Sequence, residues 1–144
     1  MRDGLSNTQV IRGANQTLSG ITPNASAAFD VRGFSTATFD LGTVTVTDAG
    51  TDAGFTMKLQ HSDTLVGTDF ADVSAGEYLG DLVTLTAETA AATIGSVCYV
   101  GNKRYVRGVF TGTTGTNAVV FVNGNMGKPH RAPVTRVGAT IATT

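Results

Sequence analysis

The sequence predicts an all-β protein, folded as an antiparallel β-sandwich or a jelly-roll-like barrel with extended N- and C-terminal arms. Of its 144 residues, 24 are Thr and 18 are Gly, and only 15% are charged. Thr is β-branched and suits a pleated, half-buried surface, while Gly suits tight turns and bulges. Short runs that alternate apolar and polar residues recur between Gly-, Asn- and Asp-rich turns, which favours a sandwich or barrel. No strand alternates with a long helical pattern, so a parallel α/β sheet is not expected.

The chain is expected to have three parts. They are an N-terminal arm, a β-sandwich domain and an extended C-terminal tail, over residues 1–25, 26–127 and 128–144. The arm holds two short β-like runs, 7–12 and 16–22, among Gly, Asn and Ser. In the tail, Pro129 and Pro133 stand four residues apart, a spacing that excludes a helix and a central strand. Both ends therefore suit contact with a neighbouring subunit by strand exchange.

The first half of the domain contains three β-like runs, at residues 26–31, 35–40 and 55–61. Apolar residues are odd-numbered up to Leu41 and even-numbered from Val44, and Gly42 lies at the change. One extra residue at a glycine is typical of a β-bulge. We therefore expect residues 36–47 to form one long bulged strand, or two strands that turn a corner.

The second half predicts further strands at residues 82–86, 97–100, 104–111 and 117–123. The last three follow one another through residues 101–103 and 112–116, two Gly-containing connections of hairpin length. Residues 62–80 form a long acidic connection, and residues 87–94 are the one helix candidate. The anchors expected in the acidic connection are Phe70, Val73 and Tyr78.

The alternation also predicts the core. Its expected members are Phe39, Leu41, Phe55, Met57, Leu59, and one residue from each of the pairs Tyr105 or Val106, Val109 or Phe110, and Val120 or Phe121. The pairs stay open because both faces of the last two strands are apolar. Two apolar faces indicate that one packs the core and the other packs a neighbouring subunit.

Charge is divided along the chain, although the net charge is only −1. Residues 48–88 hold eight acidic residues and one Lys, whereas residues 101–144 hold six Lys or Arg and no acid. Such a chain could pair head to tail with copies of itself, hold its own halves together, or simply place strands of the two halves side by side.

The residues of common catalytic and metal sites are scarce. His61 is followed by Ser62 and Asp63, but neighbours on a strand point to opposite faces, so they cannot act together as a triad. The single cysteine, Cys98, cannot form an internal disulfide, and with two histidines it is too few for a zinc site without carboxylates. The spacing of the acids between residues 63 and 81 does not fit a calcium loop. We expect no enzymatic activity and no cofactor.

No run has the length of a membrane helix or the apolar core of a signal peptide, so we expect a soluble chain that is made in a cytoplasm. Lys103, Tyr105 and Arg107 share one face of an expected strand, as a small basic and aromatic patch. Nucleic acid is not the expected partner, because the pI is about 6.0. An acidic partner protein, or the acidic half of the chain itself, fits the patch better.

Two stretches resemble a known family. The first is FTMKLQHSD at residues 55–63, followed by an Asp-Val pair at 72–73; the second is YVGNKRYVR at 99–107, followed by the Pro-rich end at 128–134. Together they are similar to the small head decoration, or cement, proteins of tailed phages and phage-like gene transfer particles. The match departs at Gly108, where a β-branched residue is expected, and it leaves the N-terminal arm unmatched.

The resemblance implies a structural virion protein that binds the outer head surface, contacts the major capsid protein, stabilises the capsid lattice and forms a homo-oligomer, a dimer or a trimer. We expect neither a membrane nor nucleic acid as a partner. The residues expected at the subunit or capsid contact are Lys103, Arg104, Tyr105, Arg107, Lys128, Pro129, His130, Arg131 and Pro133. The alternative is a tail or fibre component that binds a host-surface carbohydrate, which would need clustered exposed aromatic residues.

Overall fold

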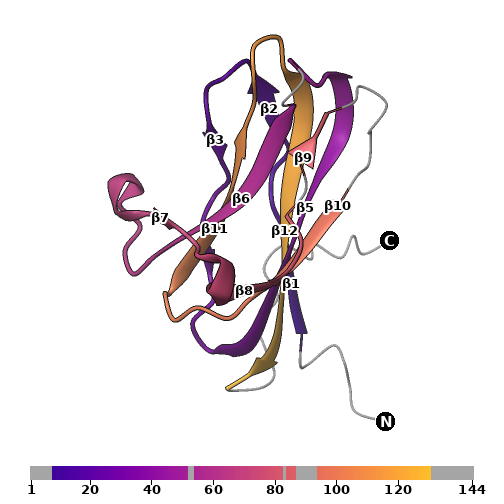
Figure 1. Cartoon of the computed structure of the whole chain (residues 1–144). Coiled ribbons are helices and arrows are strands. Elements are labelled where there is room, and N and C mark those ends of the chain that lie inside the picture. Colours follow the sequence, from indigo (N-terminus) through magenta and orange to yellow (C-terminus); the bar gives the residue numbers. More distant parts are fainter. Residues whose placement is uncertain (1–7, 52–53, 83, 87–93, 131–144) are drawn as a thin grey trace, which may run out of the picture.

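The protein is a sandwich of two antiparallel sheets (Figure 1). The computed structural model describes residues 8–51, 54–82, 84–86 and 94–130. The first sheet has the order β1-β12-β5-β10-β8, and β2 also pairs with β12. Its strands are β1 (Thr8–Arg12), β2 (Gln16–Ser19), β5 (Phe34–Asp48), β8 (Tyr78–Gly80), β10 (Ile94–Tyr99) and β12 (Asn117–Pro129). The all-β sandwich that the sequence predicts is confirmed.

The second sheet packs against the first and has the order β3-β11-β6-β7, with β4 beside β11 and β9 beside β6. Its strands are β3 (Asn24–Ala25), β4 (Phe29–Asp30), β6 (Phe55–Ser62), β7 (Ala71–Asp72), β9 (Thr84–Leu85) and β11 (Tyr105–Thr111). Two short 3-10 helices, η1 (Gly67–Asp69) and η2 (Ala75–Glu77), lie in the expected acidic connection.

The core lies between the sheets; it includes the predicted residues and also residues that were not predicted, among them Leu18, Phe29, Tyr99 and Met126. Phe39, Leu41, Phe55, Met57 and Leu59 are all buried. Of the open pairs, Val106, Phe110 and Val120 belong to the core cluster, and Val109 is buried as well, at 3% exposure. Tyr105 and Phe121 lie on the outer faces of their strands and are half-buried.

The predicted long bulged strand is β5, but its irregularity is not at Gly42. The buried odd-numbered positions continue through Thr43, and the pairing with β12 skips Val44, since Val120 lies opposite Thr43 and Val119 opposite Thr45. A second register shift follows before Asp48. Gly42 misled the sequence argument because a bulge needs an extra residue and does not require a glycine.

The two connections expected as hairpins are not hairpins. β10 belongs to the first sheet and β11 to the second, so residues 101–103 cross from sheet to sheet, and residues 112–116 cross back to β12. A short Gly-containing turn can close a hairpin or bridge a sandwich. The burial of Val106 and Phe110 against the first sheet decided between them.

Both expected arms contribute strands to the first sheet. β1 and β2 pair with β12, and Leu18 in β2 is fully buried. At the other terminus, β12 runs on to Pro129, which lies opposite Phe34 in β5. The expectation of no strand at Pro129 was wrong, because Pro129 lies beyond Gly127, the last residue of β12 that pairs with β1 among the described residues, so β12 is paired there on the β5 side. Proline is tolerated where a strand has an unpaired edge. The helix candidate at residues 87–94 lies outside the described residues except for Ile94, where β10 begins.

Candidate functional site

Four segments meet at the end of the sandwich where β12 finishes, which is the lower end in Figure 1. They are residues 31–34, the start of the acidic connection at Asp63, the turn 101–104, and His130, whose backbone N–H donates to Gly33 O at 2.7 Å. They surround a hollow of about 430 Å³, lined by Arg32, Phe34, Lys103 and Arg104 among others. We call this the charged hollow.

Ion pairs fix the two basic side chains of the turn. Lys103 Nζ lies 2.6 Å from Asp63 Oδ2, and the Arg104 guanidinium donates to both oxygens of Asp30, at 2.7 and 3.1 Å to Oδ2 and 3.2 Å to Oδ1. The Lys103 hydrogen bond lowers the pKa of Asp63, and the Arg104 hydrogen bond lowers the pKa of Asp30. These pairs are partly exposed, so they position the turn more than they stabilise the fold.

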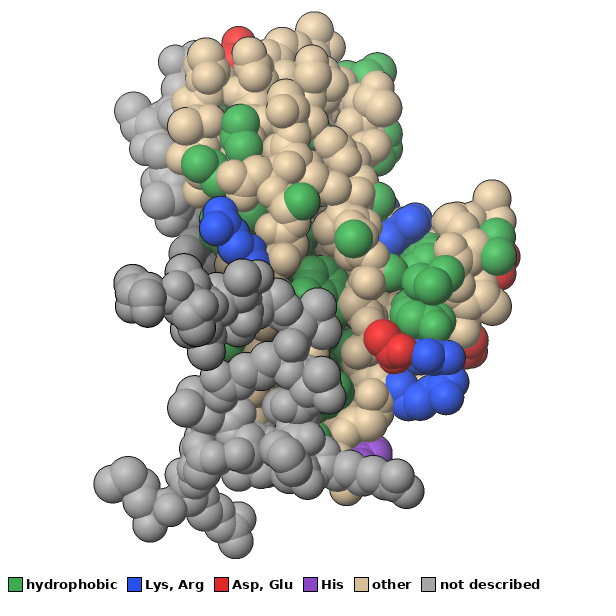
Figure 2. Space-filling view, turned by 180° about the vertical axis from the view of Figure 1, so that it is seen from behind, with side chains coloured by type: hydrophobic (Ala, Val, Ile, Leu, Met, Phe, Trp, Pro, Cys, Tyr) green, Lys and Arg blue, Asp and Glu red, His purple; other side chains and the backbone are tan. Residues whose placement is uncertain are grey.

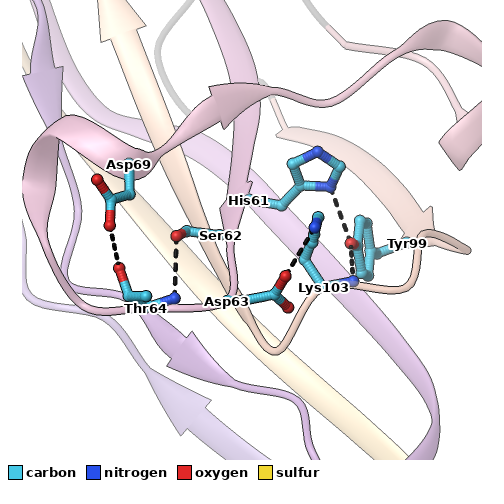
Figure 3. A network of polar contacts seen from close by, with 7 residues as sticks. All are labelled: His61, Ser62, Asp63, Thr64, Asp69, Tyr99 and Lys103. Carbon is cyan, nitrogen blue, oxygen red and sulfur yellow. Dashed lines mark hydrogen bonds and ion pairs between the residues drawn. The ribbon is translucent and has the colours of Figure 1, made fainter.

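A buried polar contact between His61 and Tyr99 lies next to the Lys103–Asp63 ion pair (Figure 3). His61 Nδ1 is 2.9 Å from the Tyr99 hydroxyl, which accepts a hydrogen bond from the Lys103 backbone N–H at 3.0 Å. Burial raises the pKa of Tyr99. Because His61 lies in β6 and Tyr99 in β10, the contact joins the two sheets and anchors the turn to both.

His61, Ser62 and Asp63 do not form a triad. Ser62 Oγ accepts from Thr64 N at 3.0 Å, His61 turns to Tyr99, and Asp63 turns to Lys103 (Figure 3). The expectation that neighbours on this strand cannot cooperate is thus confirmed by their geometry. Within the described residues, no group of three or more His, Cys, Asp or Glu could hold a metal ion.

Arg107 serves a different purpose from Lys103 and Arg104. Its guanidinium donates to Gln60 Oε1 at 2.7 and 3.0 Å and to Gly67 O at 3.4 Å, and it lies 4.1 Å above the Phe70 ring. Partial burial lowers its pKa, although an arginine remains charged. The side chain therefore holds the acidic connection against β11. We call residues 62–77 the lobe; it projects sideways from the sandwich in Figure 1.

The structure thus brings together some of the predicted contact residues and separates others. Lys103, Arg104 and His130 line one hollow. Tyr105 lies on the outer face of β11, and the Arg104 guanidinium carbon lies 4.7 Å from the centre of the Tyr105 ring. Arg107, in contrast, is covered by the lobe. Lys128 and Pro129 end β12. Arg131 and Pro133 lie outside the described residues.

Three exposed aliphatic residues at this end of the sandwich were not predicted as contact residues from the sequence. Leu65 and Val66 in the lobe are 64% and 55% exposed, and Val100 after β10 is 51% exposed. Val100 lines a second hollow of about 320 Å³ beside the charged one, together with Val31, Phe34 and Cys98. Ser35, Thr36 and Tyr99 also line it, and we call it the Val100 hollow. The adjacent Leu65 and Val66, within a mostly polar connection, were the sequence feature that could have indicated an exposed apolar contact. Figure 2 shows hydrophobic side chains on the part that projects from the sandwich, with acidic and basic side chains around it.

Comparisons with known proteins extend only to the fold. No family model matches the sequence, and no curated protein matches it. Among solved structures, the chain aligns over its full length with the PBSX exported protein XepA, at 14% identity and a TM-score of 0.55, and spans 44% of that chain. This likeness supports the sandwich fold. A structure of Bacillus endospore appendages, described as disulfide-linked pili, aligns with 90% of this chain and 96% of its own at 12% identity. Its TM-score of 0.41 is too low to support an argument.

No helix within the described ranges is long and apolar enough to cross a membrane.

Proposed function

We propose that this chain is a structural virion protein, a decoration or cement protein that binds the major capsid protein on the outer head surface and stabilises the capsid lattice. The observation that carries the proposal is the loop end of the sandwich. There Lys103, Arg104 and His130 line one open hollow, and exposed Val100 lines the next. Many modest polar and apolar contacts suit a protein that ties other subunits together.

The fold comparison supports a phage-related structural role at the coarser level. XepA is described as a PBSX exported protein, and its fold is similar to that of this chain over all 144 residues. The proposal includes an assembly outside the cell or on a virion, with the head surface as the particular place. It also includes no catalytic activity, no nucleic-acid partner and no membrane partner.

The alternative, a tail or fibre component that binds host carbohydrate, would use exposed aromatic side chains. All ten Phe and Tyr residues lie in the described part of the chain, and each is buried or half-buried. Charged side chains lie at the hollow instead, where Lys103 and Asp63 form an ion pair. Charged groups at a contact surface suit a protein partner with complementary charge. This favours a protein partner.

Particle composition tests the proposal. Quantitative mass spectrometry of purified particles should find hundreds of copies of the chain per particle, because a lattice-binding protein repeats with the lattice. A count between about three and twelve, as expected from the symmetry of a tail or fibre, would move the assignment to the alternative.

Binding to particles stripped of the protein tests the surface. The double variant Lys103→Glu with Arg104→Glu should bind at least about tenfold more weakly at low salt. Arg12→Glu, an exposed arginine on β1, is the matched control and should bind like the wild type. Urea unfolding of each variant separates lost binding from lost folding. Equal binding by all three proteins would remove this surface from the proposal.

A further inference from the structure

The lobe presents an unusual tip for a loop. Leu65 and Val66 are adjacent, and both are more than half exposed. Single exposed aliphatic side chains are common on protein surfaces and need no explanation. Here the two apolar neighbours sit together on a projecting segment (Figure 1), which is the form of a knob that inserts into another surface.

The tip is also held in place. Thr64 Oγ1 donates to Asp69 Oδ2 at 2.6 Å and accepts from Val66 N at 3.3 Å, and Asp69 N donates to Val66 O at 3.0 Å. Arg107 adds its hydrogen bond to Gly67 O. Bracing of this kind removes in advance the conformational entropy that a flexible loop would lose on binding.

The chain carries a surface of matching character. The Val100 hollow, of about 320 Å³, has a mixed lining, with the apolar residues Val31, Phe34, Ala37, Cys98 and Val100 beside the polar residues Ser35, Thr36 and Tyr99. It shares Val31 and Phe34 with the charged hollow, which contains Arg32. Arg32 is exposed and makes none of the ion pairs found among the described residues. A hollow with exposed Val100 in its lining and an arginine in the adjoining hollow would accept an aliphatic knob that carries acids.

The lobe is such a knob. Residues 62–77 contain four acidic residues and no Lys or Arg, and exposed Asp69 lies beside the tip without an ion pair in the described structure. We propose that the Leu65–Val66 tip of one copy inserts into the Val100 hollow of a second copy, with Asp69 directed to Arg32 of that copy. The occupant of the hollow is thus the lobe of a neighbouring chain.

The same chain cannot supply both sides of this contact to itself. Asp63, at the base of the lobe, lines the charged hollow, while the tip projects away from the sandwich. The contact joins two different surfaces and is therefore head to tail, so repetition gives a closed ring or an open filament.

Sedimentation velocity over a concentration series tests the contact in the full chain without particles. Wild-type protein should associate as its concentration rises. Leu65→Asp with Val66→Asp removes the knob, and Val100→Asp blocks the hollow; each should weaken association at least about tenfold, because burial of unpaired carboxylates is costly. Ile21→Asp is the matched control, since Ile21 is 67% exposed and lies in the turn after β2.

Mixing the two defective variants gives the decisive result. The hollow of the knob variant is intact, and so is the knob of the hollow variant, so an equimolar mixture should form dimers with one working contact and nothing larger. A mixture that stays monomeric would overturn the proposal, as would a wild-type chain that remains monomeric up to about 1 mM. Particle binding is measured separately, so a monomer that still binds particles would end this inference and leave the proposed function standing.

Discussion

Gly108 shows how one residue sets the distance between the sheets. A Cβ added to it would lie 2.5 Å from Val122 Cγ2 and 3.1 Å from Leu41 Cδ2, both in the opposite sheet. The family resemblance led us to expect a β-branched residue at this position of β11. The structure explains the glycine, because a larger side chain would push the sheets apart.

Gly108→Ala should therefore lower the free energy of unfolding by about 1–3 kcal/mol through overpacking. Urea unfolding measures the change. Gly76→Ala is the control, since no atom lies within 4 Å of a Cβ at that position. Val122→Ala should recover part of the loss when combined with Gly108→Ala. Equal stability of the Gly108 and Gly76 variants would contradict the tight packing.

The Tyr99 hydroxyl is the second decisive group at this scale, because it partners both His61 Nδ1 and the Lys103 N–H. Tyr99→Phe leaves these two buried or half-buried groups unpaired and should cost about 1–3 kcal/mol of unfolding free energy. The control is Tyr78→Phe, a half-buried tyrosine whose hydroxyl has no hydrogen bond within the described residues. A Tyr99→Phe loss no larger than the control would show that the contact is energetically neutral.

At the scale of elements, β12 organises the first sheet. It pairs with β5 along nearly its whole length on one side and with β1 and β2 on the other. The bulge at Val44 lets β5 keep an inward face on both sides of the irregularity, with Thr43 buried before it and Val46 packed on the core after it. One extra residue thus allows a strand of fifteen residues to follow the twist of the sheet.

The lobe is the element whose order depends most on one side chain. Arg107→Ala removes the contacts to Gly67 O and Phe70, so amide hydrogens of residues 64–72 should exchange markedly faster while those of β6 and β11 stay protected. Hydrogen exchange with mass spectrometry measures this. Arg107→Lys, which keeps the charge but not the planar fork, should give an intermediate rate. Unchanged exchange in the alanine variant would mean that the lobe is held by its internal hydrogen bonds alone.

Across the molecule, some of the divided charge is neutralised by ion pairs within the chain. Lys103 from the basic half pairs with Asp63 from the acidic half, and Lys58 pairs with Asp72 inside the acidic half. Hydrogen bonds from Lys58 and Gln60 lower the pKa of Asp72, as those from basic partners lower the pKa of Asp63 and Asp30.

This arrangement predicts a loss of stability in acid. A carboxyl whose pKa is lower in the folded state stabilises the fold above its unfolded value, 3.8 for Asp, and that stabilisation disappears as pH falls through the folded value. Unfolding free energies measured from neutral pH down to about pH 2 should therefore fall below pH 3.8. Asp30→Asn should fall less steeply than the wild type over the same range. Parallel curves would show that Asp30 is not coupled to folding.

The fold class, many of the alternating core positions and the existence of a bulged strand could be predicted from the sequence, because hydrophobic periodicity and turn-forming residues are local properties of the chain. The sequence also named Lys103, Arg104 and His130 as expected contact residues, and the structure adds that they line one hollow. The three-dimensional packing was needed to show that residues 101–103 and 112–116 cross between sheets and that β1 and β2 complete the first sheet. It was also needed to show that Arg107 holds the lobe in place. Those outcomes depend on which distant apolar face a strand packs against, and a strand with two apolar faces does not specify that choice in its own residues.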